Sequence, residues 1–226
     1  MKILFKANGT HYEHAKIMQC VKKFGDSYND TVRFIIKNSN QGISKPIFEE
    51  NVGRLLSNFK MTRNGSFKGV RFLGSNLEDP NGKVSACWRT VGTDLIEIRK
   101  EMDELTIGNR TRFLTNINQN DLSKIINKIW IAFKKLLPVC MGKHSLGMVA
   151  SSKILFAVLP EIALPVDNKQ WLTVFQTVDY GDIINLMVDE IKAWEKITGK
   201  QLQTCDHSEY TTLPAIYNVM AMKARP

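Results

Sequence analysis

Apolar residues recur every three or four positions over long stretches of this chain, and no other feature constrains its fold as strongly. An α-helix turns once in about 3.6 residues, so apolar residues at this spacing form a stripe along one helical face. Such a stripe is buried only when it packs on another element. The 226 residues are therefore predicted to form a mainly α protein with a core shared among several helices.

Several helices can be placed from these stripes and from their end signals. Pro46, a residue favoured in the first turn, opens a helix with apolar residues from Phe48 to Phe59. Thr93 is expected to cap a helix ending near Leu105, and another helix runs from 120 to an expected stop at Pro138. Further helices are predicted over 146–160, 168–178, 181–200 with Gly199 as C-cap, and 208–223.

Strand signals are few. Residues 31–37 and 69–74 are short runs that could form a hairpin or irregular structure. A small β element is therefore expected in the N-terminal third of the chain.

The charge balance is basic, with 31 Lys and Arg against 22 Asp and Glu. Residues 51–77 hold five basic and no acidic side chains, and residues 121–170 hold seven Lys against three acidic residues. Basic patches attract nucleic acids or anionic membranes. No window approaches the roughly 20 apolar residues of a membrane span, and the N-terminus lacks the pattern of a secretory signal. A cytoplasmic protein that binds nucleic acid is expected.

The cysteines are far apart and form no CxxC pair: Cys20, Cys87, Cys140 and Cys205. Free thiols in a reducing compartment are the simplest interpretation. Cys140 with His144, and Cys205 with His207, lack the spacing of common zinc sites. The two histidines of HYEH, residues 11–14, are interpreted as a solvated helix start. No metal site is expected.

Asp167 stands in LPVDNKQW, residues 164–171, between an apolar run and the start of a helix. An Asp in front of a helix is among the commonest N-caps, because its side chain accepts a hydrogen bond from first-turn amides. The same carboxylate, held rigidly and ionised by those amides, is suited to stabilise developing positive charge. The local residues thus leave two interpretations, a structural cap and a catalytic group.

The surroundings of Asp167 carry a further signal. A short polar hairpin, an apolar helix and the connection PEIALPV lead to Asp167, with Trp171 four residues later and Asp179 and Tyr180 beyond it. This stretch, residues 138–181, resembles the helix-hairpin-helix DNA glycosylases, most closely the 8-oxoguanine type. The resemblance implies a two-lobed helical fold over a single domain, residues 1–226, and an enzyme that extrudes a base from DNA and cleaves it from its sugar.

The resemblance also implies roles for single residues. Asp167 corresponds to the Asp that these enzymes use in breaking the base–sugar bond. Lys169 corresponds to a position that contacts backbone phosphate, and Lys153 on the apolar helix is expected to face DNA. The hairpin corresponds to the segment that holds the DNA backbone, sometimes with a monovalent cation; its residues here are Lys143, His144, Ser145 and Gly147. No other cofactor and no obligate protein partner are expected.

This chain also departs from the family. The family hairpin usually reads Leu-Pro-Gly-Val-Gly, whereas here Gly142 and Gly147 stand at a different spacing. Bifunctional members carry a nucleophilic Lys nineteen residues before the Asp, and that position is Met148. Lys153, five residues further on, points elsewhere around the helix. Because a Schiff base needs an amine nucleophile, a monofunctional enzyme is expected, without a strong lyase step.

The resulting hypothesis is a DNA glycosylase for a modified or damaged base. Its role would be either repair or defence against modified foreign DNA, such as that of a virus. The first alternative is a non-catalytic DNA-binding protein of the same fold, in which Asp167 is only a cap. A basic RNA-binding protein is the second.

Overall fold

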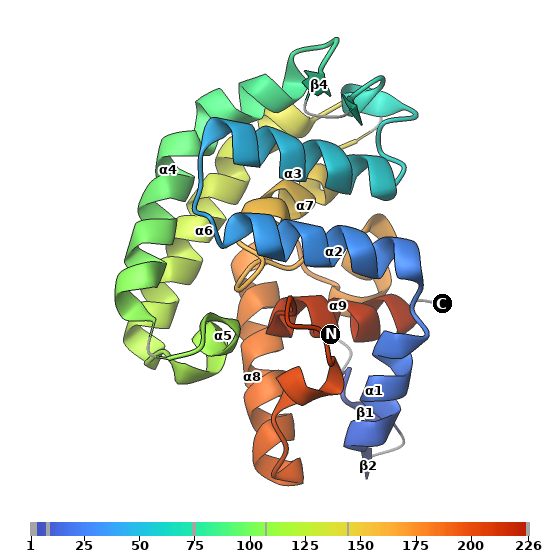
Figure 1. Ribbon diagram of the computed structural model, residues 1–226, viewed down its shortest axis with the longest axis vertical. Helices are drawn as coiled ribbons and strands as arrows, with labels where there is room; N and C mark the ends of the chain where they lie inside the picture. Colours follow the sequence, from blue (N-terminus) through green and yellow to red (C-terminus); the bar gives the residue numbers. More distant parts are fainter. Residues whose placement is uncertain (1–3, 8–9, 74–75, 107, 144, 225–226) are drawn as a thin grey trace.

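The computed structural model describes residues 4–7, 10–73, 76–106, 108–143 and 145–224 (Figure 1). Its helices are α1 His14–Lys22, α2 Asp26–Ser39, α3 Lys45–Asn58, α4 Lys83–Leu105, α5 Phe113–Asn116, α6 Gln119–Cys140, α7 Met148–Val158, α8 Tyr180–Thr198 and α9 Leu213–Lys223. Shorter turns are the 3-10 segments η1 Gly65–Phe67, η2 Arg110–Arg112 and η4 Leu202–Cys205, and the π-helical η3 Gln170–Phe175. The mainly α class is confirmed.

The strands form two small antiparallel hairpins. β1 Lys6–Ala7 pairs with β2 Thr10–His11, and β3 Arg71–Leu73 pairs with β4 Asn76–Glu78. The first hairpin lies in the first third of the chain and the second spans its end, so the small β element expected there is confirmed. β3 lies within the predicted run 69–74.

The helices lie in two groups (Figure 1). In one group α4 and α6 lie side by side, and α2 packs on both α3 and α7. In the other, α1 near the start of the chain packs on α9 near its end, and α9 packs on α8. Contacts between α6 and α8, and between η3 and α9, join the two groups. The segment 159–178 therefore lies at their junction.

The run 31–37 is helical, within α2, and not a strand. The buried residues of α2 include Val32, Ile35, Ile36 and Ser39, at intervals of three and four. That spacing places all four on one face of a helix, towards α3 and α7. Packing of this face outweighs the β preference of Val and Ile.

Two predicted helix ends are wrong, and two are confirmed. α4 begins at Lys83 and not at Thr93, because the Asp79 carboxylate accepts from the amides of Lys83 and Ser85 at 2.9 and 3.0 Å. α6 continues past Pro138 to Cys140, with the proline inside its last turns. The start of α3 at Lys45–Pro46 and the left-handed Gly199 after α8 are as predicted.

A buried ion pair ties α4 to the connection after α7. Arg99 donates to both carboxylate oxygens of Glu161 at 2.9 and 3.0 Å and to the Val158 carbonyl at 2.9 Å. The two side chains are only 4% and 2% exposed. Such a pair holds its segment in place, because separation would leave a charge buried without compensation.

The N-terminal and C-terminal segments meet at a second buried carboxylate. Glu190 of α8 accepts from the Leu4 amide and from the Tyr217 hydroxyl. Burial raises the pKa of Glu190 to about 7, against the two hydrogen bonds, which lower it.

Among the described helices, none has both the length and the apolar character needed to cross a membrane.

Candidate active site

The backbone leading to Asp167 is clamped from two helices. Ser152 of α7 accepts from the Val166 amide and donates to its carbonyl, both at 3.1 Å. Tyr180, at the start of α8, does the same for Leu164, both at 2.8 Å. The segment 162–166 is buried, so these side chains satisfy backbone groups that water does not reach. Asp167 is thereby delivered to one defined position.

Asp167 caps the turn that follows it. Its backbone amide donates to Gln170 Oε1 at 2.6 Å, and the Gln170 amide donates to Asp167 Oδ1 at 2.8 Å. This is a capping box, in which the cap residue and the residue three positions later satisfy each other. The interpretation of Asp167 as an N-cap is therefore confirmed. The Asp167 side chain is half-buried, and the amide contact fixes the orientation of its carboxylate.

A buried polar network lies behind this cap. Gln170 Nε2 donates to Asn218 Oδ1 of α9 at 3.2 Å, and Asn218 Nδ2 donates to the Tyr28 hydroxyl of α2 at 2.6 Å. Gln170 is 1% exposed and Asn218 is fully buried. Burial raises the pKa of Tyr28, so its hydroxyl remains protonated. Three segments from distant parts of the chain thus meet behind Asp167.

Aromatic rings and a buried cation continue this network. The ring centroids of Phe24 and Tyr28 are 4.7 Å apart, and those of Tyr28 and Phe59 are 5.9 Å apart, both edge-on. Lys153 is 4% exposed, and its Nζ lies 3.8 Å from the centroid of the Phe59 ring. Lys153 therefore does not lie at the helix surface. Only a ligand that enters the fold can reach its amine.

The turn after Asp167 is unusual in its backbone. It continues as the π-helical η3 and ends at Gln176, which has a positive φ of 53°. The helix predicted over 168–178 is thus shorter and wider than expected. Trp171 packs against Phe133, and its Nε1 is buried with no hydrogen-bond partner among the described residues. Single π turns of this kind occur often at functional sites.

The hairpin before α7 is a tight turn. Gly142 and Ser145 exchange backbone hydrogen bonds at 3.0 and 3.1 Å. Gly147 has a φ of 80°, and a Cβ there would lie 2.6 Å from the Leu137 carbonyl, so only glycine fits before α7. Lys143 and Ser145 are exposed, as is Lys169 beside Asp167. His144 lies outside the described residues.

The hairpin and the turn after Asp167 enclose a groove of about 870 Å³. Three of its side chains are large, apolar and exposed: Leu146 at 71%, Leu172 at 67% and Val178 at 74%. Met148 also lines the groove. The structure thus brings the hairpin, Met148 and the residue after Asp167, Asn168, to one surface.

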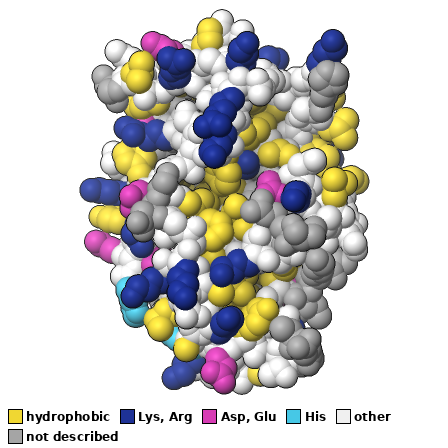
Figure 2. Space-filling view, turned by 90° about the vertical axis from the view of Figure 1, so that its right-hand side faces the viewer, with side chains coloured by type: hydrophobic (Ala, Val, Ile, Leu, Met, Phe, Trp, Pro, Cys, Tyr) yellow, Lys and Arg dark blue, Asp and Glu magenta, His cyan; other side chains and the backbone are white. Residues whose placement is uncertain are grey.

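One face of the molecule combines a hollow with basic side chains (Figure 2). Hydrophobic side chains line the hollow, and Lys and Arg gather above and below it. This is the side of the molecule on which Figure 1 places α1 and the ends of α2 and α3. Such an arrangement suits an anionic polymer whose apolar parts enter the hollow.

The described residues contain no group of three or more His, Cys, Asp or Glu placed to hold a metal ion. All four cysteines are buried thiols. His11 lies in β2 and not on a helix, so the predicted helical placement of the HYEH segment is wrong for this residue.

Comparison with protein-family models, with curated proteins and with solved structures finds no match.

Proposed function

We propose that the protein is a DNA glycosylase that extrudes a modified or damaged base and hydrolyses its bond to the sugar. Departure of the base leaves positive charge on the sugar. A fixed carboxylate beside the anomeric carbon stabilises that charge and orients a water. Asp167 is the residue proposed for this role.

The network behind Asp167 carries the proposal. An ordinary N-cap needs only its own side chain and the amides of the first turn. Here the partner of the cap, Gln170, is buried and held by Asn218, which is held by Tyr28. A buried polar chain is costly to build unless every member is satisfied, and its effect is to fix orientation. The network therefore supports a catalytic role for Asp167, because catalysis requires its carboxylate to be held in one orientation.

The alternative is a DNA-binding protein without catalysis, in which the same network only stabilises the junction of the two helical groups. A panel of duplexes, each with a different modified base, separates the two. We expect one or more of them to yield abasic sites. Binding to the whole panel without release of any base would favour the alternative. Repair and defence roles differ in the base that is released.

The exposed lysines beside the site are predicted to contact DNA phosphates. Changing Lys143 and Lys169 to Ala should weaken binding to every DNA sequence alike. The slope of log affinity against log salt should fall by about two, because up to two phosphate contacts are lost. Fluorescence anisotropy with labelled duplexes over a range of salt concentrations measures both.

A matched pair of lysines lies outside the residues that line the groove beside Asp167. Lys100 of α4 and Lys134 of α6 are also exposed. Changing both to Ala removes the same charge and should leave the salt slope close to that of the unchanged protein. Equal effects from the two pairs would mean that only net charge matters, and would remove Lys143 and Lys169 from the proposed site.

The reaction is predicted to stop at base removal. Met148 offers no amine, and the Lys153 amine lies against the Phe59 ring. Borohydride added during turnover should therefore trap little covalent protein–DNA adduct, as seen by gel electrophoresis. Efficient trapping that disappears in a Lys153→Met variant would instead make Lys153 a nucleophile and the enzyme bifunctional.

A further inference from the structure

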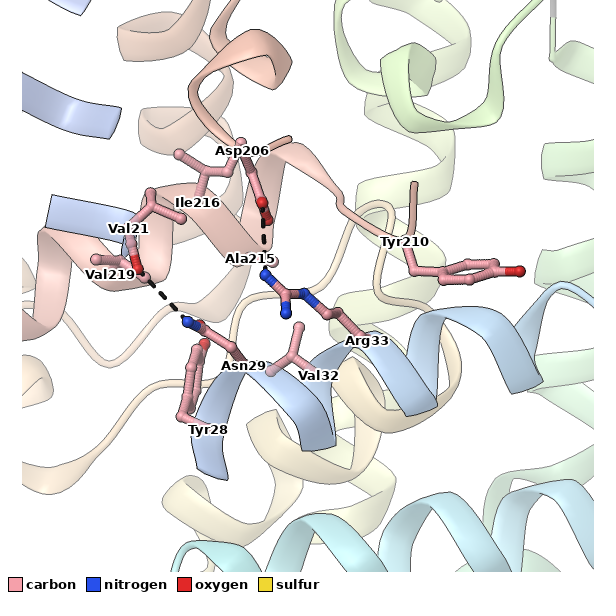
Figure 3. A pocket seen from close by; sticks show the side chains of 10 residues that line it. All are labelled: Val21, Tyr28, Asn29, Val32, Arg33, Asp206, Tyr210, Ala215, Ile216 and Val219. Atoms are coloured by element: carbon pink, nitrogen blue, oxygen red, sulfur yellow. Dashed lines mark hydrogen bonds and ion pairs between the residues drawn. The ribbon is translucent and has the colours of Figure 1, made fainter. Parts of the chain in front are cut away.

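A second groove, of about 970 Å³, lies between α1, α2 and the segment 205–208. Its cationic side chains are Lys22, Lys23 and Arg33, with His207 beside them. Asp206 is the single carboxylate among the lining residues that the structure describes. The groove shares Arg33, Asp206 and Asn29 with a narrower hollow, shown in Figure 3, that reaches inward to Tyr28.

Arg33 is only loosely paired in this groove. Its Nη2 lies 3.8 Å from Asp206 Oδ1, and its Nη1 lies 3.9 Å from Asp30 Oδ1, both beyond hydrogen-bond distance. Figure 3 shows the guanidinium pointing towards Asp206. Asp206 Oδ1 already accepts from the Ser208 amide at 3.0 Å. Arg33 Nε is buried and has no partner among the described residues. The guanidinium therefore keeps donors for a further acceptor.

The groove holds more cationic side chains than carboxylates among its described lining residues. Lys22 and Lys23 lie at the end of α1, where the helix dipole favours cations. That accounts for their position, and Asp206 is the one carboxylate that lines the groove with them among the described residues. An exposed Lys pair next to an under-bonded Arg is suited to phosphate, which accepts from several donors at once.

We propose that this groove binds backbone phosphates of the same DNA that occupies the Asp167 site. The narrower hollow that shares Arg33, Asp206 and Asn29 with this groove reaches Tyr28. Tyr28 is hydrogen-bonded through Asn218 to Gln170, the capping partner of Asp167. Figure 2 shows basic side chains on both sides of the hollow, including the end of the molecule where α1 lies. One DNA strand that crosses the hollow would contact Lys22 and Lys23 on one side and Lys143 and Lys169 on the other. The inference rests on the proposed function in taking DNA as the partner and the Asp167 site as its other point of contact.

The test is binding of unmodified duplexes of increasing length to a Lys22→Ala, Lys23→Ala variant. Short duplexes should bind the variant and the unchanged protein alike. Above a threshold length the variant should bind more weakly, with a salt slope lower by about two. The Lys100→Ala, Lys134→Ala variant should show no such threshold. Arg33→Lys, which keeps the charge but not the forked donors, should also weaken binding of long duplexes.

Each other outcome overturns the proposal. Unchanged affinity and salt slope at every length would mean that the groove does not contact DNA. Equal weakening at every length, together with displacement of short duplexes by millimolar pyrophosphate only when Lys22 and Lys23 are present, would mean a site for a free phosphate compound. Because the duplexes carry no modified base, a protein without glycosylase activity can still pass this test.

Discussion

Asp167→Asn is expected to reduce single-turnover base release by at least about a hundredfold while leaving the protein folded and able to bind DNA. The substitution keeps the size of the side chain and an oxygen that can accept from the Gln170 amide, and Asn caps helices about as well as Asp. It removes the negative charge opposite the sugar cation. Loss of one such preorganised electrostatic contact typically costs about two to three orders of magnitude in rate.

The chain supplies its own control for this experiment. Asp179 is also an N-cap, and its Oδ1 accepts from the Asp182 amide at 3.0 Å at the start of α8. Asp179→Asn should change neither base release nor the unfolding temperature to a measurable degree. Thermal unfolding and DNA binding are measured beside base release for both variants. Release by Asp167→Asn at the unchanged rate would leave Asp167 as a cap, like Asp179.

The helical class can be predicted from the sequence because the spacing of apolar residues within one helix is a local pattern. The stripes of α3, α6 and α8 are read directly from residues three and four apart. The start of α4 was missed because its cap, Asp79, lies four residues before the helix and acts through a loop. α2 was missed because Val and Ile favour strands, and only packing against α3 and α7 decides between the two.

The position of Asp167 as an N-cap and the hairpin before α7 could be predicted because each is encoded in one contiguous stretch. The Asp-x-x-Gln spacing of the capping box was also present in the sequence and would have indicated Gln170. Asn218 and Tyr28 carry no signal for the site, since they are 190 residues apart in the chain. Phe59 is visible only as part of an apolar stripe. Lys153 was expected to face DNA but is buried, because the local pattern does not show that α2 and α3 cover α7.

Arg99→Ala is the substitution expected to cost the most stability, about 3–5 kcal/mol of the free energy of unfolding. Glu161 would remain buried with its carboxylate deprived of two charged donors. Arg110 Nε, 3.4 Å from Glu161 Oε1, would compensate in part, so the lower end of this range is expected. Chemical denaturation, followed by circular dichroism, measures the change. Arg89→Ala, at an exposed position of the same helix, should stay within about 0.5 kcal/mol of the unchanged protein.

A double variant shows whether the loss comes from the stranded carboxylate. Arg99→Met with Glu161→Met removes both charges and fills the space with apolar side chains, and replacements of this kind often restore stability. Recovery of most of the loss is expected. The connection that carries Glu161 also delivers Asp167, so the double variant should fold yet release base more slowly if the ion pair positions that connection. Failure of the double variant to recover stability would show that the contact of Arg99 with the Val158 carbonyl, and not its charge, carries the effect.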